Sequence, residues 1–262
     1  MQEVILSIII VNFKSRAYLE KCLLSVFAKI DSSISFEVIV VNNGARAEVS
    51  GLTDEFPRIK IIQSSQNSGF GNANNLGAKE SVGEILFFLN PDAEIISADI
   101  SLVAREFENN STLGVIGAKL VEPGGSVQKW SAGGKITLGS VLKNNLRKTG
   151  DEKYWQSSEK VEVSWVAGTA MFIPRALFLQ LGGFDVKFFT YFEDVDLCNR
   201  TQLLGKKVAY LPEFSVLHYG GKSFLERKEQ KKNYYQSQDY YFQKHRGFFE
   251  AVLLKIFRFF SF

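Results

Sequence analysis

The chain has 262 residues, enough for one large α/β domain or for such a domain followed by a helical tail. Hydrophobic residues make up 45% of it and charged residues 23%, which argues against a disordered chain and against a polytopic membrane protein. The formal net charge of +3 is too small to indicate nucleic-acid binding. We therefore expect a globular protein with no nucleic-acid partner.

The cysteines and the first residues bear on the cellular compartment. Cys22 and Cys198 lie in apolar, helix-like stretches and lack the spacing of a metal site. The first residues lead directly into a strand pattern, without the successive regions of a secretion signal. We therefore expect buried free thiols in a cytoplasmic protein.

The first 120 residues alternate between strand and helix patterns. Apolar runs at 6–11, 36–41 and 85–89 are typical of strands buried on both faces of a parallel sheet. Between them, apolar residues recur at helical spacing from Tyr18 to Phe27, and a second helix is expected at 72–80. This alternation predicts an α/β fold with a Rossmann-like, mostly parallel sheet flanked by helices.

The second half of the chain is more mixed, with glycine pairs that mark turns. Short helices are expected at 177–181 and 195–204, strands at 208–211 and 215–217, and an aromatic-rich helix at 229–245. We divide the chain into a domain at 1–225 and a helical C-terminal extension at 226–262. Within the domain, 1–120 is the expected nucleotide-binding half and 121–225 the acceptor-binding and catalytic half.

Polar residues follow the predicted parallel strands, at the sheet edge where open α/β sheets bind ligands. The first strand ends in Val11, Asn12 and Phe13, and the second ends in Asn42. We interpret these four residues as candidates for binding a nucleotide donor. For Asn12, helix capping is the alternative.

A glycine-rich segment gives three further candidates for donor binding, namely Asn67, Gly69 and Asn72. It lies where a loop meets a predicted helix, so backbone can approach a phosphate closely there. An ordinary turn is the alternative, because the segment matches neither the dinucleotide fingerprint nor the P-loop.

Asn90 and Asp92 follow the third apolar strand and indicate a metal and diphosphate site. Mg²⁺ or Mn²⁺ bound to a diphosphate needs only one or two protein oxygen ligands, although an Asp after a Pro is also common in plain turns. His218 follows a later strand and is a candidate second metal ligand, with a structural histidine as the alternative. Lys222 and Ser223, beside glycines, are suited to binding a diphosphate.

Three acidic residues, Glu193, Asp194 and Asp196, fall within four positions at the start of a predicted helix. They follow an aromatic stretch at 188–192 that would line a partly dry pocket suited to a general base. The alternative is a charged first turn favoured by the helix dipole. Trp165, Gly168 and Thr169 precede this stretch and are candidates for the pocket that holds the acceptor sugar.

Taken in order, these segments resemble the bacterial family-2 glycosyltransferases, specifically their rhamnosyltransferase-like group. The resemblance covers nearly the whole chain and rests on the segments SIIIVNF at 7–13, VVNN at 40–43, NSGFG at 67–71, NPD at 90–92, GTA at 168–170, EDVD at 193–196 and HYGGKS at 218–223. It implies a GT-A fold. It also implies that Asp194 is the catalytic base, with Glu193 and Asp196 as fallback candidates, and that Asp92 and His218 contact the metal. Asn90 and Asn42 depart from the aspartates that many relatives have at these positions.

The function implied by this resemblance is that of an inverting, metal-dependent glycosyltransferase. The resemblance favours transfer of rhamnose from dTDP-rhamnose, a nucleotide-diphosphate donor, to a glycan or polyprenyl-linked acceptor in cell-surface polysaccharide synthesis. The alternatives are a UDP-hexose or N-acetylhexosamine transferase of the same fold, and an inactive nucleotide-sugar-binding protein. A nucleotidyltransferase would need a glycine-rich loop after the first strand, where this chain has Asn12, Phe13 and Lys14.

The tail at 247–260 is apolar but interrupted by charges, and it is too short to span a bilayer. One helical face would carry Phe249, Val252, Leu253, Ile256 and Phe260, with Lys255 and Arg258 able to reach water. This pattern predicts peripheral contact with the inner face of the cell membrane. Packing on the protein's own core, or in a homodimer, is the alternative.

Overall fold

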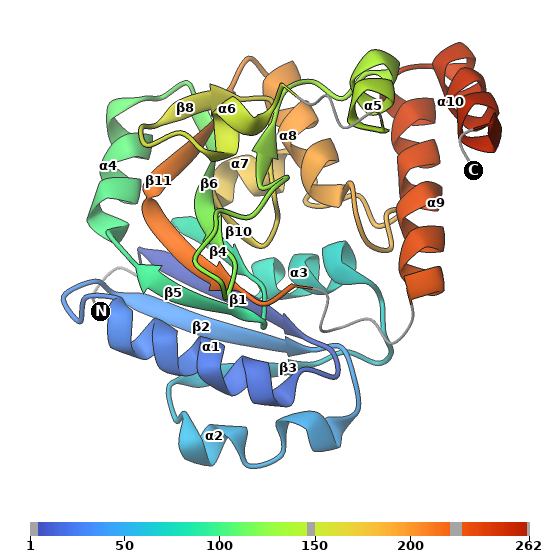
Figure 1. Cartoon of the computed structure of the whole chain (residues 1–262). Helices are drawn as coiled ribbons and strands as arrows, with labels where there is room; N and C mark the ends of the chain where they lie inside the picture. Colours follow the sequence, from blue (N-terminus) through green and yellow to red (C-terminus); the bar gives the residue numbers. More distant parts are fainter. Residues whose placement is uncertain (1–4, 146–149, 221–226, 261–262) are drawn as a thin grey trace.

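The computed structural model describes residues 5–145, 150–220 and 227–260. Helices cover both faces of a central sheet, and two C-terminal helices lie along one side of it (Figure 1). In chain order the elements are β1 Leu6–Asn12, α1 Arg16–Lys29, β2 Phe36–Asn42, η1 Arg46–Val49, α2 Leu52–Glu55, β3 Ile59–Gln63, α3 Phe70–Lys79, β4 Ile85–Leu89, β5 Ala93–Ser97, α4 Ile100–Asn109, β6 Leu113–Val121, β7 Ala132–Gly133, α5 Leu138–Asn145, α6 Glu152–Trp155, β8 Val161–Val163, β9 Trp165–Val166, β10 Ala170–Pro174, α7 Arg175–Gln180, α8 Glu193–Leu203, β11 Lys207–His218, α9 Arg227–His245 and α10 Phe248–Phe260.

The main sheet of the described residues has the order β3-β2-β1-β4-β10-β6-β11-β5, and β8 also pairs with β11. Strands β1 to β4, β6 and β11 run in one direction, whereas β5, β8 and β10 run against it. The expected mixed, mostly parallel sheet is therefore confirmed. Strand β6 lies between β10 and β11, so both halves of the chain contribute strands to one continuous sheet.

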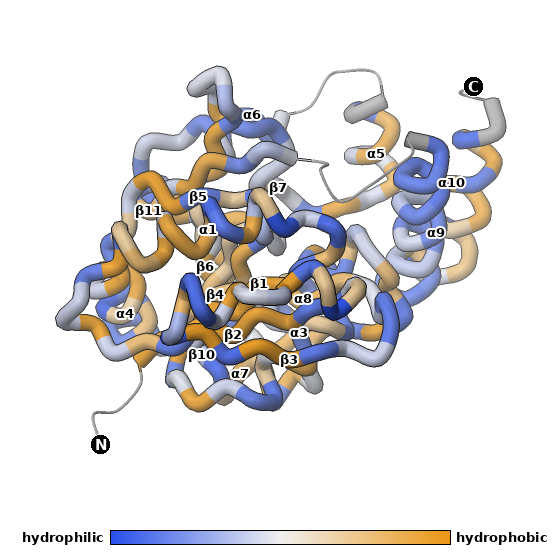
Figure 2. Tube along the Cα trace, turned by 90° about the horizontal axis from the view of Figure 1, so that it is seen from below, coloured by the Kyte–Doolittle hydropathy of each residue, from blue (hydrophilic) through white to orange (hydrophobic). Residues whose placement is uncertain are grey.

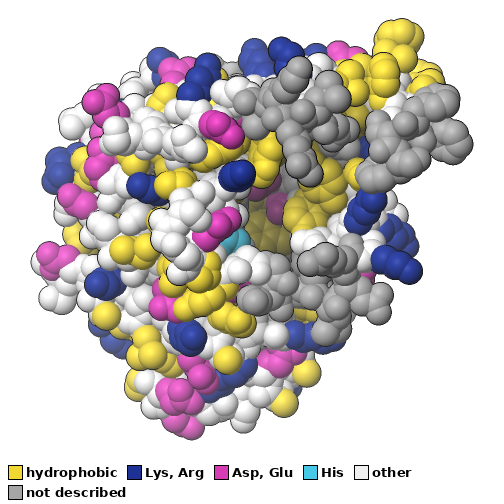
Figure 3. Space-filling model, viewed as in Figure 1, with side chains coloured by type: hydrophobic (Ala, Val, Ile, Leu, Met, Phe, Trp, Pro, Cys, Tyr) yellow, Lys and Arg dark blue, Asp and Glu magenta, His cyan; other side chains and the backbone are white. Residues whose placement is uncertain are grey.

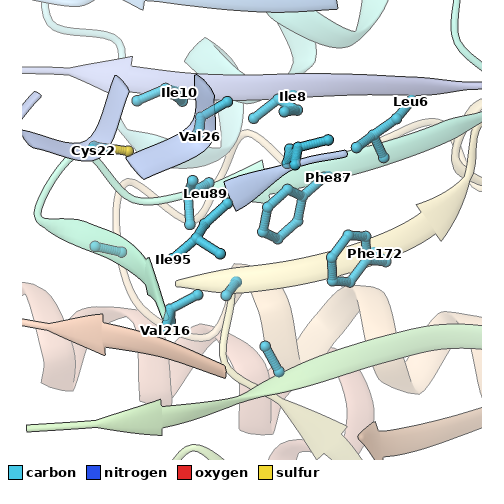
Figure 4. Packing of buried hydrophobic residues seen from close by; sticks show 14 of the residues in the cluster. Leu6, Ile8, Ile10, Cys22, Val26, Phe87, Leu89, Ile95, Phe172 and Val216 are labelled. Atoms are coloured by element: carbon cyan, nitrogen blue, oxygen red, sulfur yellow. The ribbon is translucent and has the colours of Figure 1, made fainter. Parts of the chain in front are cut away.

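The three apolar runs form β1, β2 and β4 because these strands are covered on both faces. Successive residues of a strand point to opposite faces, so Ile8 and Ile10 pack under α1 whereas Ile9 faces α3. Figure 4 shows Ile8, Ile10 and Phe87 close to Cys22 and Val26. The strands accordingly form an apolar centre between more polar helices (Figure 2).

Aromatic rings continue this core across the antiparallel pair β4 and β10. The rings of Phe87 and Phe172 stack with centroids 4.0 Å apart, and Phe214 meets both rings edge-on.

Both cysteines are buried free thiols, as expected, and burial raises the pKa of each above its usual range.

Several element boundaries differ from expectation. Helix α3 begins at Phe70, two residues early, and α8 begins at Glu193 rather than Val195. The two short strands expected at 208–211 and 215–217 are one long strand, β11, with a register shift between Leu211 and Ser215. Pro212 lies in the shifted stretch, where it has no backbone N–H to donate to a neighbouring strand.

The C-terminal helices α9 and α10 pack on each other and against the body of the protein. Tyr241 and Phe242 of α9 are buried in the core, and Arg258 of α10 donates hydrogen bonds to Gln238 and Asp239 of α9. Within the residues that the structure describes, no helix has the length and apolar character needed to cross a membrane. The proposed boundary at residue 225 stays a prediction.

Candidate active site

A cavity of about 860 Å³ lies beyond the carboxyl ends of β1, β2 and β4. It appears in Figure 3 as a deep hollow in which hydrophobic and acidic side chains and a histidine are visible. Most of the residues predicted for the site line it, namely Val11, Phe13, Asn67, Gly69, Asn90, Asp92, Trp165, Gly168, Thr169, Glu193, Asp194 and His218. The sequence pattern therefore brings together residues from both halves of the chain.

Three residues predicted to bind the donor do not line the cavity. Asn12 is fully buried, and its Nδ2 donates to Asn42 Oδ1 at 3.0 Å. Asn42 in turn donates to Gln63 Oε1 at 2.8 Å, so these two amides tie the ends of β1, β2 and β3 together. Asn72 is exposed on α3 outside the cavity. The structure therefore does not bring these three side chains together with the others at the cavity, and their contact with a donor stays a prediction.

Asn43, one residue after Asn42, reaches the cavity instead. Its Nδ2 donates to Asn67 Oδ1 at 2.9 Å, and its Oδ1 accepts from the backbone amide of Ser68 at 3.1 Å. Asn43 thus fixes the glycine-rich segment against the end of β2. The predicted residues Lys222 and Ser223 lie outside the described part of the chain.

Backbone strain marks the same cavity independently. Lys14, Trp130, Tyr191 and Phe192 are the non-glycine residues with positive φ in the described ranges, at 52°, 61°, 67° and 67°. All four line the cavity. Such a conformation costs on the order of 1–3 kcal/mol for a bulky residue, and strain of this kind concentrates at functional sites. Because α8 begins directly after Phe192, this strained turn presents Glu193 and Asp194 to the cavity.

Asp92 and His218 form the candidate metal site. Asp92 lies in the turn between β4 and β5, and its Oδ1 is 3.3 Å from Nε2 of His218 at the end of β11. Both residues are buried, and Nδ1 of His218 is 2.7 Å from Gln128 Oε1. When Nδ1 donates to that amide oxygen and the ring is neutral, the Nε2 lone pair faces the Asp92 carboxylate.

In that state, the Asp92 carboxylate and Nε2 of His218 are both acceptors, and a cation bound between them would interact favourably with both. One carboxylate oxygen and one imidazole nitrogen are too few for a closed metal centre, and no group of three or more His, Cys, Asp or Glu side chains in the described chain is arranged to hold a metal. The pair instead fits a divalent ion whose remaining ligands come from a bound diphosphate and water.

Asp194 is held by backbone amides from two elements. Its Oδ2 accepts from Gly168 N and its Oδ1 from Val195 N, each at 2.8 Å. Burial raises the pKa of Asp194, while these amide hydrogen bonds act in the opposite direction. The result is a fixed carboxylate with increased proton affinity on the cavity wall.

Asp196 has a different environment and does not line the cavity. Its fully buried carboxylate is 2.7 Å from Arg200 Nε, 2.6 Å from Lys244 Nζ and 2.7 Å from His245 Nε2. Asp196 therefore joins α8 to the end of α9, and these contacts disfavour its expected role as a fallback base, which stays an untested prediction. The physical reason is that its oxygens are occupied by three cationic or donor groups.

Several cavity residues were not singled out from the sequence. Lys14 and Trp130 reach the cavity through positive-φ backbone that no local sequence signal marks, and Gln128 does so through its contact with His218. The aromatic stretch at 188–192, by contrast, was expected to line a pocket, and Tyr191 and Phe192 do so. Asn43 belongs to the segment VVNN at 40–43, but the sequence pattern alone does not determine toward which side of the sheet its side chain projects.

Comparison with known proteins identifies the family. The profile of glycosyl transferase family 2 matches residues 7–177, more than half of the chain. The chain belongs to glycosyl transferase family 2. As a member of this family it is an enzyme, a glycosyltransferase.

Two curated relatives of this family-2 glycosyltransferase are named as rhamnosyltransferases. The N-acetylglucosaminyl-diphospho-decaprenol L-rhamnosyltransferase of Mycobacterium tuberculosis is 25% identical over 235 residues, which cover 82% of this chain and 76% of that protein. The rhamnosyltransferase WbbL of Escherichia coli is 27% identical over 225 residues, covering 81% and 82%.

The solved structures show the fold. The crystal structure of GalNAc-T7 with UDP, GalNAc and Mn²⁺ superimposes with a TM-score of 0.68 at 17% identity and covers 92% of this chain. This family-2 glycosyltransferase spans 50% of the length of that structure. Its fold is GT-A, as expected.

Proposed function

We propose that this family-2 glycosyltransferase is an inverting, metal-dependent enzyme that transfers a sugar from a nucleotide-diphosphate donor to a hydroxyl of a glycan or lipid-linked acceptor. The observation that carries this proposal is that two separate sets of polar side chains line one cavity. Asp92 and His218 lie at the ends of β4 and β11, and Asp194 lies on α8. This arrangement supplies one group of residues for a diphosphate and one for an attacking hydroxyl.

Asp194 is the proposed general base. An incoming hydroxyl becomes a stronger nucleophile when a carboxylate accepts its proton in the transition state. The amides of Gly168 and Val195 fix the Asp194 carboxylate, so its free lone pairs have a defined direction. Direct displacement by that hydroxyl inverts the configuration at the anomeric carbon.

Asp92 and His218 are the residues that would hold Mg²⁺ or Mn²⁺ with the donor. A divalent cation at a diphosphate neutralises negative charge that develops on the leaving group. The hydrogen bond between His218 and Gln128 orients the imidazole and keeps Nε2 directed at Asp92.

For the donor we propose dTDP-rhamnose, and for the acceptor a polyprenyl-linked glycan of cell-surface polysaccharide synthesis. Support comes from the two relatives that are named as rhamnosyltransferases, one of them for a decaprenol-linked substrate. Preferred transfer from a UDP-sugar would contradict the assignment of dTDP-rhamnose as the donor.

The test of catalysis is Asp194→Asn, which keeps the shape of the side chain but removes the base. We expect turnover to fall by about two orders of magnitude or more, with donor affinity changed by only a few fold. Transfer from dTDP-rhamnose and from UDP-sugars is measured in the same assay, and the anomeric configuration of the product is read by NMR. Asp54→Asn, an exposed carboxylate on α2, is the matched control.

Two results would contradict this proposal. Turnover above a tenth of the parental value in Asp194→Asn would exclude Asp194 as the base. A product with retained configuration would exclude direct displacement.

We further propose that α10 lies in the interface of an anionic membrane. Ala251 and Leu254 are buried against the protein, whereas Phe248, Phe249 and Ile256 are exposed by 81%, 75% and 46%. The helix is therefore apolar on two sides. One face packs on the protein, and the proposed membrane contact is assigned to the other face. Lys255 is also half exposed and can meet lipid phosphates.

The position of α10 supports a lipid surface as the occupant of its exposed face. Helix α10 packs on α5 and α9, and both of these helices contribute cavity walls, including Val141 and Tyr234. An apolar region also flanks the hollow beside α10 (Figure 3). A membrane bound there would bring a lipid-linked acceptor to the cavity.

A further inference from the structure

The carboxyl group of Glu193 is a buried acid that the proposed displacement does not use. Glu193 is the first residue of α8, is only 5% exposed and lines the cavity beside Asp194. Its Oε2 atom is buried and accepts no hydrogen bond from the described residues. A polar atom that is buried without a partner destabilises the folded protein, so its position at a ligand cavity indicates that a bound ligand supplies the partner.

The surroundings of Glu193 and Asp194 differ in a way that separates their charge states. Asp194 accepts hydrogen bonds from the backbone amides of Gly168 and Val195, and such donors favour an ionised carboxylate. Glu193 Oε2 has no such donor. An ionised Glu193 would therefore be a poorly solvated charge directly beside the charge of Asp194, and two adjacent buried carboxyl groups do not readily ionise together.

We propose that Glu193 is held as the neutral acid and that its Oε2–H donates a hydrogen bond to a hydroxyl oxygen of the sugar bound in the cavity. Glu193 is then a binding residue that orients the sugar, and Asp194 alone is the base. This inference rests on the proposed glycosyl transfer, and it assigns opposite protonation states to two neighbouring carboxyl groups.

The titratable groups that face Glu193 agree with this assignment. Burial raises the pKa of Glu193 well above its usual range, and the charge of Asp194 and, more weakly, that of Asp196 add to this effect. A hydrogen bond from its own backbone amide acts in the opposite direction. The Tyr191 hydroxyl also interacts with Glu193, and burial is the largest cause that raises the pKa of Tyr191. Among the described residues, the groups that shift the pKa of Glu193 include no cation.

The kinetic test compares Glu193→Gln with Glu193→Ala. Glutamine keeps an N–H donor at nearly the same place but cannot ionise, whereas alanine removes the hydrogen bond. We expect kcat/KM for the acceptor or donor sugar to fall less than about tenfold in Glu193→Gln and about 100-fold in Glu193→Ala, because one lost hydrogen bond to a substrate corresponds to about 1–3 kcal/mol. If Glu193→Gln loses as much activity as Glu193→Ala, the ionised carboxylate is required and the proposal is wrong.

A second test needs no substrate and therefore does not depend on the proposed function. A carboxyl group whose pKa is raised in the folded state loses its contribution to stability as pH rises from the unfolded-state pKa through the folded-state pKa. Glu193→Gln cannot ionise, so its Tm minus that of the parent should increase from pH 4 to pH 9. A difference that stays flat or decreases over this range would show an ionised Glu193 and overturn the proposal. If Asp194→Asn is inactive and the Tm difference for Glu193→Gln increases with pH, both assignments are supported. If Asp194→Asn is active, only the assignment of Asp194 as the base is contradicted.

Discussion

Asp92 and His218 are far apart in the sequence, yet their side chains are 3.3 Å apart in the structure. Pairing of β5 with β11 places His218 opposite Ala93, the residue after Asp92. The antiparallel register of two strands therefore creates the candidate metal pair. Their residue types were recognisable from the sequence, whereas Gln128, which orients the histidine, depends on a contact that only the folded chain contains.

We expect Asp92→Ala and His218→Ala to weaken metal-dependent binding of the nucleotide donor by about tenfold or more, since each removes one of few protein ligands. Calorimetry with dTDP and with UDP, in the presence of Mn²⁺, Mg²⁺ or EDTA, measures this effect. Asp54→Ala serves as the control, because Asp54 is an exposed acid away from the cavity. Unchanged donor affinity in either cavity variant, with metal present, would remove that residue from the proposed ligand set.

At the scale of elements, α8 explains why the acidic segment permits two interpretations. Each residue of a helix is rotated by about 100° from the last, so acids at adjacent positions face different surroundings. Glu193 and Asp194 face the cavity, while Asp196 points toward α9 and binds Arg200, Lys244 and His245. The sequence pattern predicted a helix that begins near these acids. Which acid faces the cavity depends on the first residue of α8, and that residue follows the strained Phe192.

The same limit applies to β1 and β2. Their apolar runs predicted buried strands and a polar sheet edge, and both predictions are confirmed. Which amide reaches the cavity depends on alternation along the strand, so Asn43 lines the cavity and Asn42 does not. The chemistry of the edge was therefore predictable, whereas the direction of its individual side chains was not.

We expect Asp196→Asn to destabilise the protein by about 3 kcal/mol at pH 7, because a buried ion-pair network loses its anion. Burial alone would raise the pKa of Asp196, but the contacts with His245, Arg200 and Lys244 lower it overall. A lowered folded-state pKa gives stability above the unfolded-state pKa that is lost as pH falls. The difference between Asp196→Asn and the parent in urea unfolding should therefore be larger at pH 7 than at pH 2. Equal differences at both values would show that the charge of Asp196 does not stabilise the fold.

At the scale of the whole molecule, the cavity and α10 form one side of the protein. Helix α10 packs on α9 and α5 (Figure 1), and both of these helices contribute lining residues to the cavity that is visible as the hollow in Figure 3. The sequence predicted an apolar tail, but not that its two faces would have different environments. That distinction comes from the tertiary packing of Ala251 and Leu254.

The membrane proposal is tested by substitution on the exposed face alone. We expect Phe249→Glu combined with Ile256→Glu to abolish co-flotation with vesicles of anionic phospholipid, because charge at the acyl boundary opposes insertion. The fold should be retained, since both side chains are exposed. Leu203→Glu, at an exposed apolar residue of α8, should float like the parent. Failure of the parent to float, or a change from dimer to monomer in the double variant, would replace the membrane with a second copy of the chain.

The place of β10 in the sheet also constrains how the protein is made. This strand lies between β4 and β6, although it follows both of them in the sequence. While a ribosome has produced only the residues up to the end of β6, the apolar edge of β4 has no neighbour and β6 has neither of its two main partners. Open strand edges of this kind favour association between chains. We infer that the nascent protein passes through an aggregation-prone stage. Synthesis of Ala170–Pro174 closes the gap between β4 and β6, and the other edge of β6 is covered only when Lys207–His218 has been made.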